Sequence, residues 1–322
     1  MALKQIPLGD TGLLVSELVF GALPGGPIQK GMSPAELAPV IVRCIRGGVT
    51  LIDGAHVYRT WPHVAEAFRL VGPAAAARVA VATKSASSDP VEFRGQLEEC
   101  LAVLGRPRAD ILFIHGARND FSLDRYGRVI EELGRLKAAG RIRHGALSTH
   151  RVAACRGALA VPEIEVVMPI ANLTGMGIAD GSLDEMLSAV AELRAAGRGL
   201  VLMKALAGGA LIARREEALR WARERSGCHA VALGMVSEAE AGYNLALFGG
   251  EPLPADGPGR GALAAKRLTI LRKVCKRCGA CVEKCPTGAM RVGPECAEPD
   301  PAKCVLCGYC IPACGHFCIR MV

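Results

Sequence analysis

The chain has 322 residues, a formal charge of +8, 51% hydrophobic residues and 4% aromatic residues. This length allows one large domain beside a smaller one, and no apolar run reaches the ~18 residues that cross a bilayer. The basic residues have no accompanying aromatic platform, which argues against nucleic-acid binding. The sequence therefore predicts no membrane and no nucleic-acid partner, and a core of Ala, Val, Leu and Ile.

In the first 248 residues, short β-branched runs alternate with amphipathic stretches. The expected strands are Leu18–Leu23, Val49–Asp53, Val79–Lys84, Ile111–His115, Arg143–Ser148, Glu165–Ile170, Gly199–Lys204 and His229–Gly234. The expected helices include Ala35–Arg46, Val91–Leu104, Tyr126–Ala139, Ser182–Ala196, Glu216–Glu224 and Glu238–Phe248. This alternation predicts an α/β fold, a (β/α)8 TIM barrel. A doubly wound sheet is the alternative, but no G-x-G-x-x-G follows an early strand.

Residues 249–262 are rich in Gly and Pro and are expected to form a linker after a barrel over residues 1–248. The following segment, Leu263–Val274, is predicted to be a basic helix that leads into a cysteine-rich end. That helix crowds positive charge before the first cysteine. Three interpretations of these basic residues stay open. They form a solvated helix face, they compensate an anionic group, or they dock an acidic redox partner such as a ferredoxin.

Ten of the fourteen cysteines lie after residue 274, and eight of them form two C-x-x-C-x-x-C-x-x-x-C runs. This spacing is typical of [4Fe–4S] ligation, in which the fourth cysteine of each run binds the other cluster. The predicted ligand sets are Cys275, Cys278, Cys281 and Cys314 for one cluster, and Cys304, Cys307, Cys310 and Cys285 for the other. Zinc sites do not explain the third cysteine of each run. Cys296 and Cys318 are left as bystanders.

The cysteine runs resemble a bacterial two-cluster ferredoxin over roughly residues 270 to 320. Residues 263–322 are therefore expected to form a small ferredoxin-like α+β iron–sulfur domain that packs near the barrel mouth. So many free thiols, with no apparent signal peptide, predict a reducing cytoplasm.

Four polar residues follow three consecutive strands of the expected barrel: Asp53, Tyr58, Lys84 and His115. The active sites of such barrels lie at this end of the strands. Together with the opening segment Gly9–Ser16, these residues resemble the aldo-keto reductases over roughly residues 4 to 248, and the cysteine runs narrow the resemblance to the ferredoxin-bearing branch. The resemblance implies that Tyr58 is the general acid, that Lys84 lowers its pKa while Asp53 holds Lys84, and that His115 orients the substrate oxygen.

The resemblance also implies a nicotinamide coenzyme, NAD(P)H, in the barrel. The positions expected to contact it are Gly21, Ser148, Thr149, Met168, Lys204, Gly234, Ser237, Glu240 and Asn244. Only Ser148 matches the general family pattern cleanly. Glu240 stands where that pattern has a basic residue, so NADPH should be penalised more than NADH.

The resulting hypothesis is an oxidoreductase that interconverts a small carbonyl compound and an alcohol, with two [4Fe–4S] clusters for electron transfer. Two alternatives stay open. One is a ferredoxin-linked electron-transfer protein whose barrel is a scaffold. The other is a barrel isomerase or lyase that uses the same Tyr–Lys pair without nicotinamide.

Overall fold

The structure is a computed structural model that describes residues 3–117, 123–254, 267–314, 316 and 318–321. Within these residues eight parallel strands form a closed barrel in which β10 pairs with β3 to complete the ring. The predicted barrel is confirmed. Its strands are β3 (Leu18–Gly21), β4 (Leu51–Asp53), β5 (Ala80–Ser85), β6 (Ala109–Ala117), β7 (Ile142–Thr149), β8 (Val166–Pro169), β9 (Gly199–Leu202) and β10 (Ala230–Gly234).

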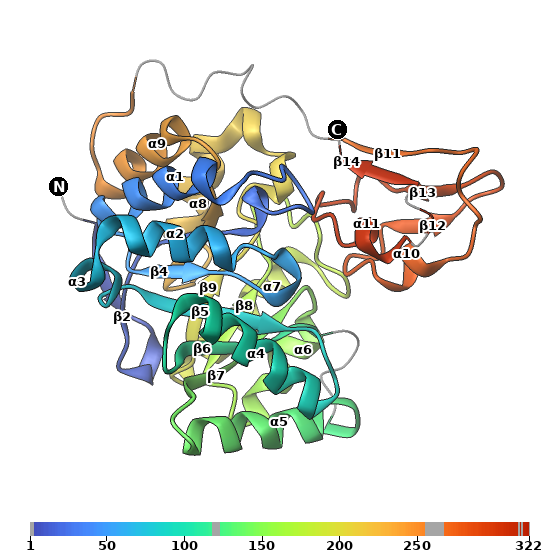
Figure 1. Cartoon of the computed structure of the whole chain (residues 1–322). Coiled ribbons are helices and arrows are strands. Elements are labelled where there is room, and N and C mark those ends of the chain that lie inside the picture. The colour runs from blue at the N-terminus through green and yellow to red at the C-terminus, as the bar shows by residue number, and fades with distance from the viewer. Residues whose placement is uncertain (1–2, 118–122, 255–266, 315, 317, 322) are drawn as a thin grey trace.

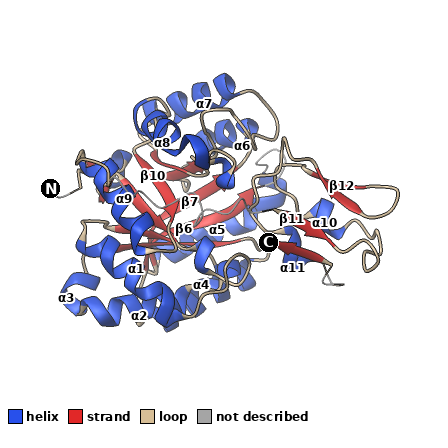
Figure 2. Cartoon of the chain, turned by 90° about the horizontal axis from the view of Figure 1, so that it is seen from above, coloured by secondary structure: helices blue, strands red, loops and turns tan. Residues whose placement is uncertain are grey.

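Helices surround the barrel (Figures 1 and 2). Their termini are well specified by the sequence: Ser33 and Glu36 form a capping box at the first helix, and Ser182 and Glu185 form another. In the described part of the chain, no helix is long and apolar enough to cross a bilayer. The helices are α1 (Pro34–Arg46), α2 (Trp61–Val71), α3 (Pro73–Ala76), α4 (Pro90–Leu104), α5 (Leu123–Ala138), α6 (Val152–Gly157), α7 (Leu183–Ala195), α8 (Arg215–Glu224) and α9 (Glu238–Gly249).

The floor of the barrel is closed by the antiparallel hairpin of β1 (Gln5–Pro7) and β2 (Leu14–Ser16). Leu8 and Leu13 from this hairpin are buried against the inward side chains of the barrel, including Phe113. The interior is thus a packed core, and functional groups are left to the opposite, carboxyl end of the strands.

The described C-terminal residues, 267–314, 316 and 318–321, form a small α+β unit beside the barrel, which we call the tail (Figure 1). Two antiparallel strand pairs and two short helices build it. These are β11 (Leu268–Ile270), α10 (Ala280–Glu283), β12 (Met290–Val292), β13 (Ala297–Pro299), α11 (Cys310–Ala313) and β14 (Ile319–Met321).

The basic helix predicted over residues 263–274 is wrong for the described part of that range. Leu268–Ile270 is strand β11, which pairs with β14, and a turn follows it. The backbone groups of these residues are therefore hydrogen-bonded between two strands and not along a helix. The remainder of that range, and most of the expected linker, lies outside the described residues.

The tail packs onto the barrel mouth through residues 304–310, which we call the docking loop. Val305 is 1% exposed and belongs to the same hydrophobic core as the barrel helices. A Cβ atom on Gly208 would lie 1.6 Å from the carbonyl oxygen of Val305, and one on Gly177 would lie 2.5 Å from its side chain. Glycine is therefore required where the loops after β8 and β9 meet the docking loop, and the expected packing of the tail against the mouth is confirmed.

Candidate active site at the barrel mouth

A buried ion pair lies at the carboxyl ends of β4 and β5. The Lys84 ammonium donates hydrogen bonds to Asp53 Oδ1 and, at 2.8 Å, to the carbonyl oxygen of Gly54. Lys84 is 2% exposed and Asp53 6% exposed. Burial raises the pKa of Asp53 and lowers the pKa of Lys84, while their mutual attraction opposes both shifts. Each charge is compensated by the other, as a buried pair requires.

Tyr58 lies beside this pair, at the end of a short 3-10 turn, His56–Tyr58, that follows β4. The Lys84 ammonium lies 5.3 Å from the centre of the Tyr58 ring. Burial holds the pKa of Tyr58 well above its usual range, and Tyr309 and Asp53 raise it further. The lowering expected from Lys84 is not seen in the net pKa of Tyr58 in this state of the protein. The charge of Lys84 is already balanced by Asp53, so burial dominates.

His115, on β6, completes the group of four residues named from the sequence. Its ring is 5.6 Å from the Tyr58 ring, centre to centre, and nearly perpendicular to it at 84°. Burial holds the pKa of His115 well below its usual range, and the positive charges of Lys84 and Lys204 lower it further. The imidazole is thus neutral at physiological pH, and it carries one N–H donor.

A fifth residue, Tyr309 of the docking loop, was not foreseen from the sequence. Its hydroxyl oxygen lies 3.2 Å from that of Tyr58 and 2.7 Å from Nε2 of His115. The two tyrosines are 251 positions apart in the chain. The only sequence signal is an aromatic residue between two predicted cluster ligands, and nothing in that pattern indicates a contact with the barrel.

A cavity of about 460 Å³ opens beside Tyr58 and extends toward the loop after β10. Its volume falls in the range of ligand sites in proteins. Tyr58, Asp53 and Tyr309 line one end, and Leu306 of the docking loop contributes to the wall. Six of the nine residues named for coenzyme binding also line it: Gly21, Met168, Lys204, Gly234, Glu240 and Asn244.

The other three named coenzyme residues are not among the lining residues of this cavity. The Ser148 hydroxyl accepts a hydrogen bond from the Gly116 amide at 3.0 Å. Thr149 is 0% exposed, and Ser237 caps helix α9 by accepting from the amide of Glu240 at 3.2 Å. In this structure the hydroxyl of Ser148 joins neighbouring strands and that of Ser237 caps a helix.

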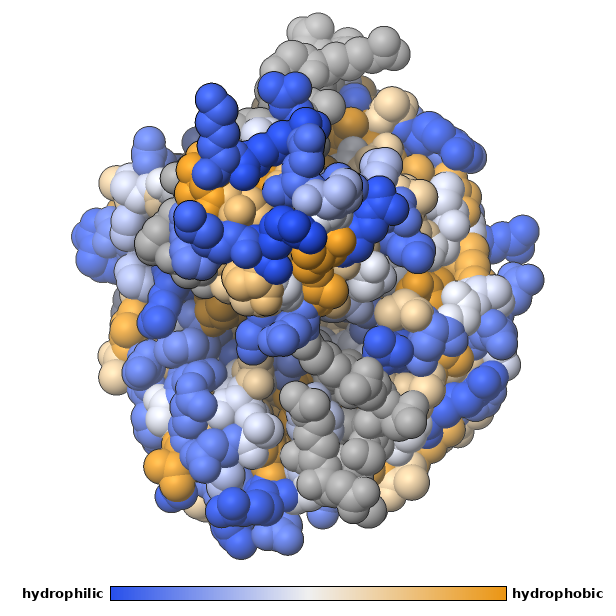
Figure 3. All heavy atoms as spheres, turned by 90° about the vertical axis from the view of Figure 1, so that its right-hand side faces the viewer, coloured by the Kyte–Doolittle hydropathy of each residue, from blue (hydrophilic) through white to orange (hydrophobic). Residues whose placement is uncertain are grey.

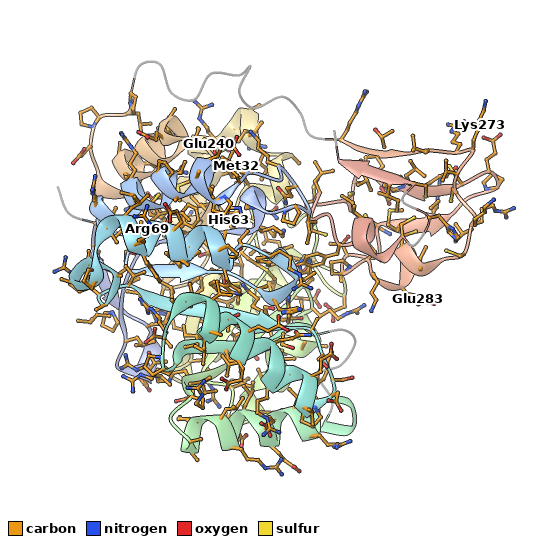
Figure 4. The ribbon with its side chains drawn as sticks, viewed as in Figure 1. Met32, His63, Arg69, Glu240, Lys273 and Glu283 are labelled. Carbon is orange, nitrogen blue, oxygen red and sulfur yellow. The ribbon has the colours of Figure 1, made fainter. Side chains whose placement is uncertain are left out.

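The far end of the cavity carries charges of both signs. Glu240 accepts a hydrogen bond from the Val236 amide at 2.7 Å. The Arg215 guanidinium stacks 4.7 Å above the Tyr243 ring, and its Nε atom is buried with no hydrogen-bond partner among the described residues. A buried, unpaired guanidinium donor on a cavity wall fits an anionic group such as a coenzyme phosphate. Figure 4 shows where Glu240 lies in the ribbon.

The tail brings its cysteines together in two groups. Burial raises the pKa of the Cys281 thiol, and three nearby sulfurs raise it further, those of Cys275, Cys278 and Cys314. Burial likewise raises the pKa of Cys310, with contributions from Cys307, Cys304 and Cys285. Each group has the same four members as one of the predicted crossed sets, and that these sets hold iron–sulfur clusters stays a prediction.

Within the described residues, no three or more His, Cys, Asp or Glu side chains converge on one ion position. A cubane spreads its four thiolates over four irons, so a single convergence point is not what such a site requires. Cys278 is exposed, whereas Cys307 is buried against the barrel. One group of cysteines therefore reaches the surface of the tail, and the other lies near the cavity. Cys318, left over from the runs, has its sulfur 3.2 Å from that of Cys314.

The chain belongs to the aldo/keto reductase family, because the family model matches residues 17–279. A second model, of a 4Fe-4S binding domain, matches residues 268–291. The protein is accordingly an oxidoreductase, and its iron–sulfur motif lies in the tail.

Two solved structures illustrate the shared fold. An aldo-keto reductase from Bacillus halodurans, in its holo form, is 20% identical with a TM-score of 0.64, covering 81% of this chain and 95% of its own. A Pseudomonas aeruginosa protein described as an aldo-keto reductase is 23% identical with a TM-score of 0.64, covering 76% of this chain and 93% of its own. No curated protein sequence matches the chain.

Proposed function

We propose that this oxidoreductase interconverts a small carbonyl compound and an alcohol, with Tyr58 as the general acid and base. The observation that carries the proposal is the position of Tyr58, between the buried Lys84–Asp53 pair and a cavity that reaches Arg215. A bound NADH or NADPH would supply or accept the hydride.

The roles of the chain's own residues follow from their contacts. Tyr58 gives its proton to the substrate oxygen during reduction and takes it back during oxidation. Lys84 is held by Asp53 and keeps a positive charge beside the Tyr58 ring, which favours the phenolate when it forms. His115 is neutral and orients the substrate oxygen through its N–H. Arg215 binds a phosphate of the coenzyme at the other end of the cavity.

Replacement of Tyr58 by phenylalanine tests this role. Tyr58→Phe keeps the ring and removes the transferable proton, so aldehyde-dependent oxidation of NADH or NADPH should fall about 10²- to 10⁴-fold. Tyr126→Phe, on helix α5 and outside the site, is the matched control and keeps its activity. Iron content should match the wild type in both variants. Turnover that survives in Tyr58→Phe would remove this residue from the mechanism.

We further propose that the tail holds two [4Fe–4S] clusters that carry electrons between the surface and the cavity. Exposed Cys278 lies in one set, and buried Cys307 in the set beside the cavity. Exposed Lys273 and Lys276 flank the surface set and would attract an acidic redox partner. Lys273 points away from the barrel in Figure 4, and in Figure 3 hydrophilic side chains surround smaller hydrophobic patches at the end of the molecule that carries the tail.

Anaerobic EPR spectroscopy tests this second proposal. Protein reduced by dithionite should show the signals of two reduced cubanes, and analysis should find about eight irons per chain. Four irons would restrict the tail to one cluster. If dithionite reduces the clusters but NADH does not, the clusters do not exchange electrons with the nicotinamide site. That result would favour a structural role for the iron.

A further inference from the structure

The hydroxyl of Tyr309 lies where a substrate oxygen would have to bind, if the proposed function is correct. A carbonyl oxygen held by Tyr58 and His115 needs to lie within about 2.7–3.2 Å of both donors. The Tyr309 oxygen meets that condition, at 3.2 Å from the Tyr58 oxygen and 2.7 Å from Nε2 of His115.

The hydrogen bonds of this trio leave one donor too few for a substrate. Each hydroxyl and the neutral imidazole supply a single proton. If the chain runs from Tyr58 to Tyr309 to His115, the Tyr58 proton is engaged by Tyr309. If it runs the other way, the His115 proton is engaged. In both cases Tyr309 removes one of the two donors on which a carbonyl oxygen would depend.

Of the hydrogen-bonded pair His115 and Tyr309, it is Tyr309 that borders the cavity. Tyr58 and Tyr309 both line the cavity, whereas His115 is not among its lining residues. The rings of His115 and Tyr309 lie 5.5 Å apart, centre to centre, at 88°. A carbonyl compound in the cavity would therefore meet the Tyr309 phenol before it could reach His115.

This contact is built into the interface and is not the tip of an exposed loop. Tyr309 follows Gly308, whose Cβ would lie 2.5 Å from the Ile28 side chain of the barrel. Four residues earlier, Val305 is buried between the glycines of two barrel loops. Withdrawal of the docking loop would expose the Val305 side chain to water, so burial of this side chain favours the docked position.

We propose that Tyr309 is a specificity-determining residue that takes the place of the substrate oxygen, so that a carbonyl compound binds at Tyr58 only when the docking loop withdraws the phenol. Simple aldehydes then compete with a group that the protein itself supplies. Only substrates that displace Tyr309, or conditions that loosen the docking loop, allow turnover at the full rate.

The test uses the anaerobic holoprotein and 4-nitrobenzaldehyde as the probe. Tyr309→Ala should bind the probe about tenfold more tightly in calorimetry without coenzyme, and should raise kcat/KM by a similar factor. Tenfold corresponds to the loss of competing hydrogen bonds of ordinary strength. Val305→Ala keeps the phenol but loosens docking, so it should give a smaller gain in the same direction. Val292→Ala, on the exposed face of the tail, is the matched control and should match the wild type.

Binding and turnover separate this inference from the proposed function. Tighter binding in Tyr309→Ala without turnover in any variant would support the inference and overturn the carbonyl–alcohol function. Binding that Tyr309→Ala leaves unchanged would overturn the inference. The inference would also be overturned if Tyr309→Ala abolishes turnover as completely as Tyr58→Phe does while keeping its full iron content. Tyr309 would then be a donor to the substrate.

Discussion

The Glu240 side chain has two roles, one in the stability of helix α9 and one in the wall of the cavity. Glu240 stabilises the start of helix α9 by accepting from the Val236 amide, and a carboxylate near a helix N-terminus is favourable. The same carboxylate lines the cavity where a coenzyme phosphate is expected. The helix therefore gains from a charge that would repel the additional phosphate of NADPH.

Neutralising Glu240 should change coenzyme preference. Glu240→Gln keeps an acceptor for the Val236 amide and removes the negative charge. We expect NADPH to bind more tightly by about 1 kcal/mol and NADH to be unaffected, which fluorescence titration with both coenzymes would measure. Equal changes for both, or none, would show that the loop after β10 does not face the 2′-phosphate.

His150 makes the protein sensitive to acid. Burial and the charge of Lys204 lower the pKa of His150 to about 3, against about 6.5 in an unfolded chain. Between these values the unfolded state binds the additional proton, so stability falls as the pH is lowered below about 6.5. The loss should approach about 1.4 kcal/mol per pH unit. His150→Gln should remove this part of the slope in urea unfolding at pH 4.5 to 7, and His316→Gln, at an exposed position, is the control. An unchanged slope in His150→Gln would show that His150 is protonated in the folded protein.

Very short helices of the tail position some of its cysteines. Helix α10 contains Cys281 and helix α11 begins with Cys310, each only four residues long. Cys314 follows α11, yet its sulfur lies near the group of Cys275, Cys278 and Cys281. The end of one run is thus folded back onto the other.

Replacing Cys314 tests this crossing. Cys314→Ser should lower the iron content from about eight to about four and remove the cluster of Cys275, Cys278 and Cys281. Cys318→Ser is the matched control, because its sulfur is the immediate neighbour and lies outside both sets. EPR spectra together with iron analysis distinguish the clusters. Loss of the other cluster, or iron loss in Cys318→Ser only, would contradict the assignment.

At the scale of the whole molecule, docking of the tail decides what the barrel mouth contains. The contact depends on glycines in barrel loops, and Gly208 has a left-handed backbone as well as the close approach to Val305. A side chain at position 208 would be strained by the positive φ and would also clash with the backbone of Val305.

Gly208→Ala should therefore loosen the docking loop. Hydrogen–deuterium exchange of residues 304–310 should rise at least about tenfold, because the loop opens at a lower free energy. Gly105→Ala is the control: Gly105 has a similar φ of +61°, but a Cβ there has nothing within 4 Å, so it carries the strain without the clash. Equal protection in both variants would mean that Val305 does not anchor the tail.

The sequence by itself determined the barrel, the iron–sulfur motif of the tail and the grouping of Asp53, Tyr58, Lys84 and His115. These follow from local patterns, because parallel strands bring their carboxyl ends to one edge and cluster ligands keep a fixed spacing. The tertiary structure alone decided three matters. Tyr309 reaches the site only through docking of the tail, Arg215 reaches the cavity from helix α8, and burial rather than Lys84 sets the direction of the Tyr58 pKa. All three depend on contacts between segments that are distant in the chain and on the exclusion of water from those contacts, and the spacing of residues in the sequence indicates none of them.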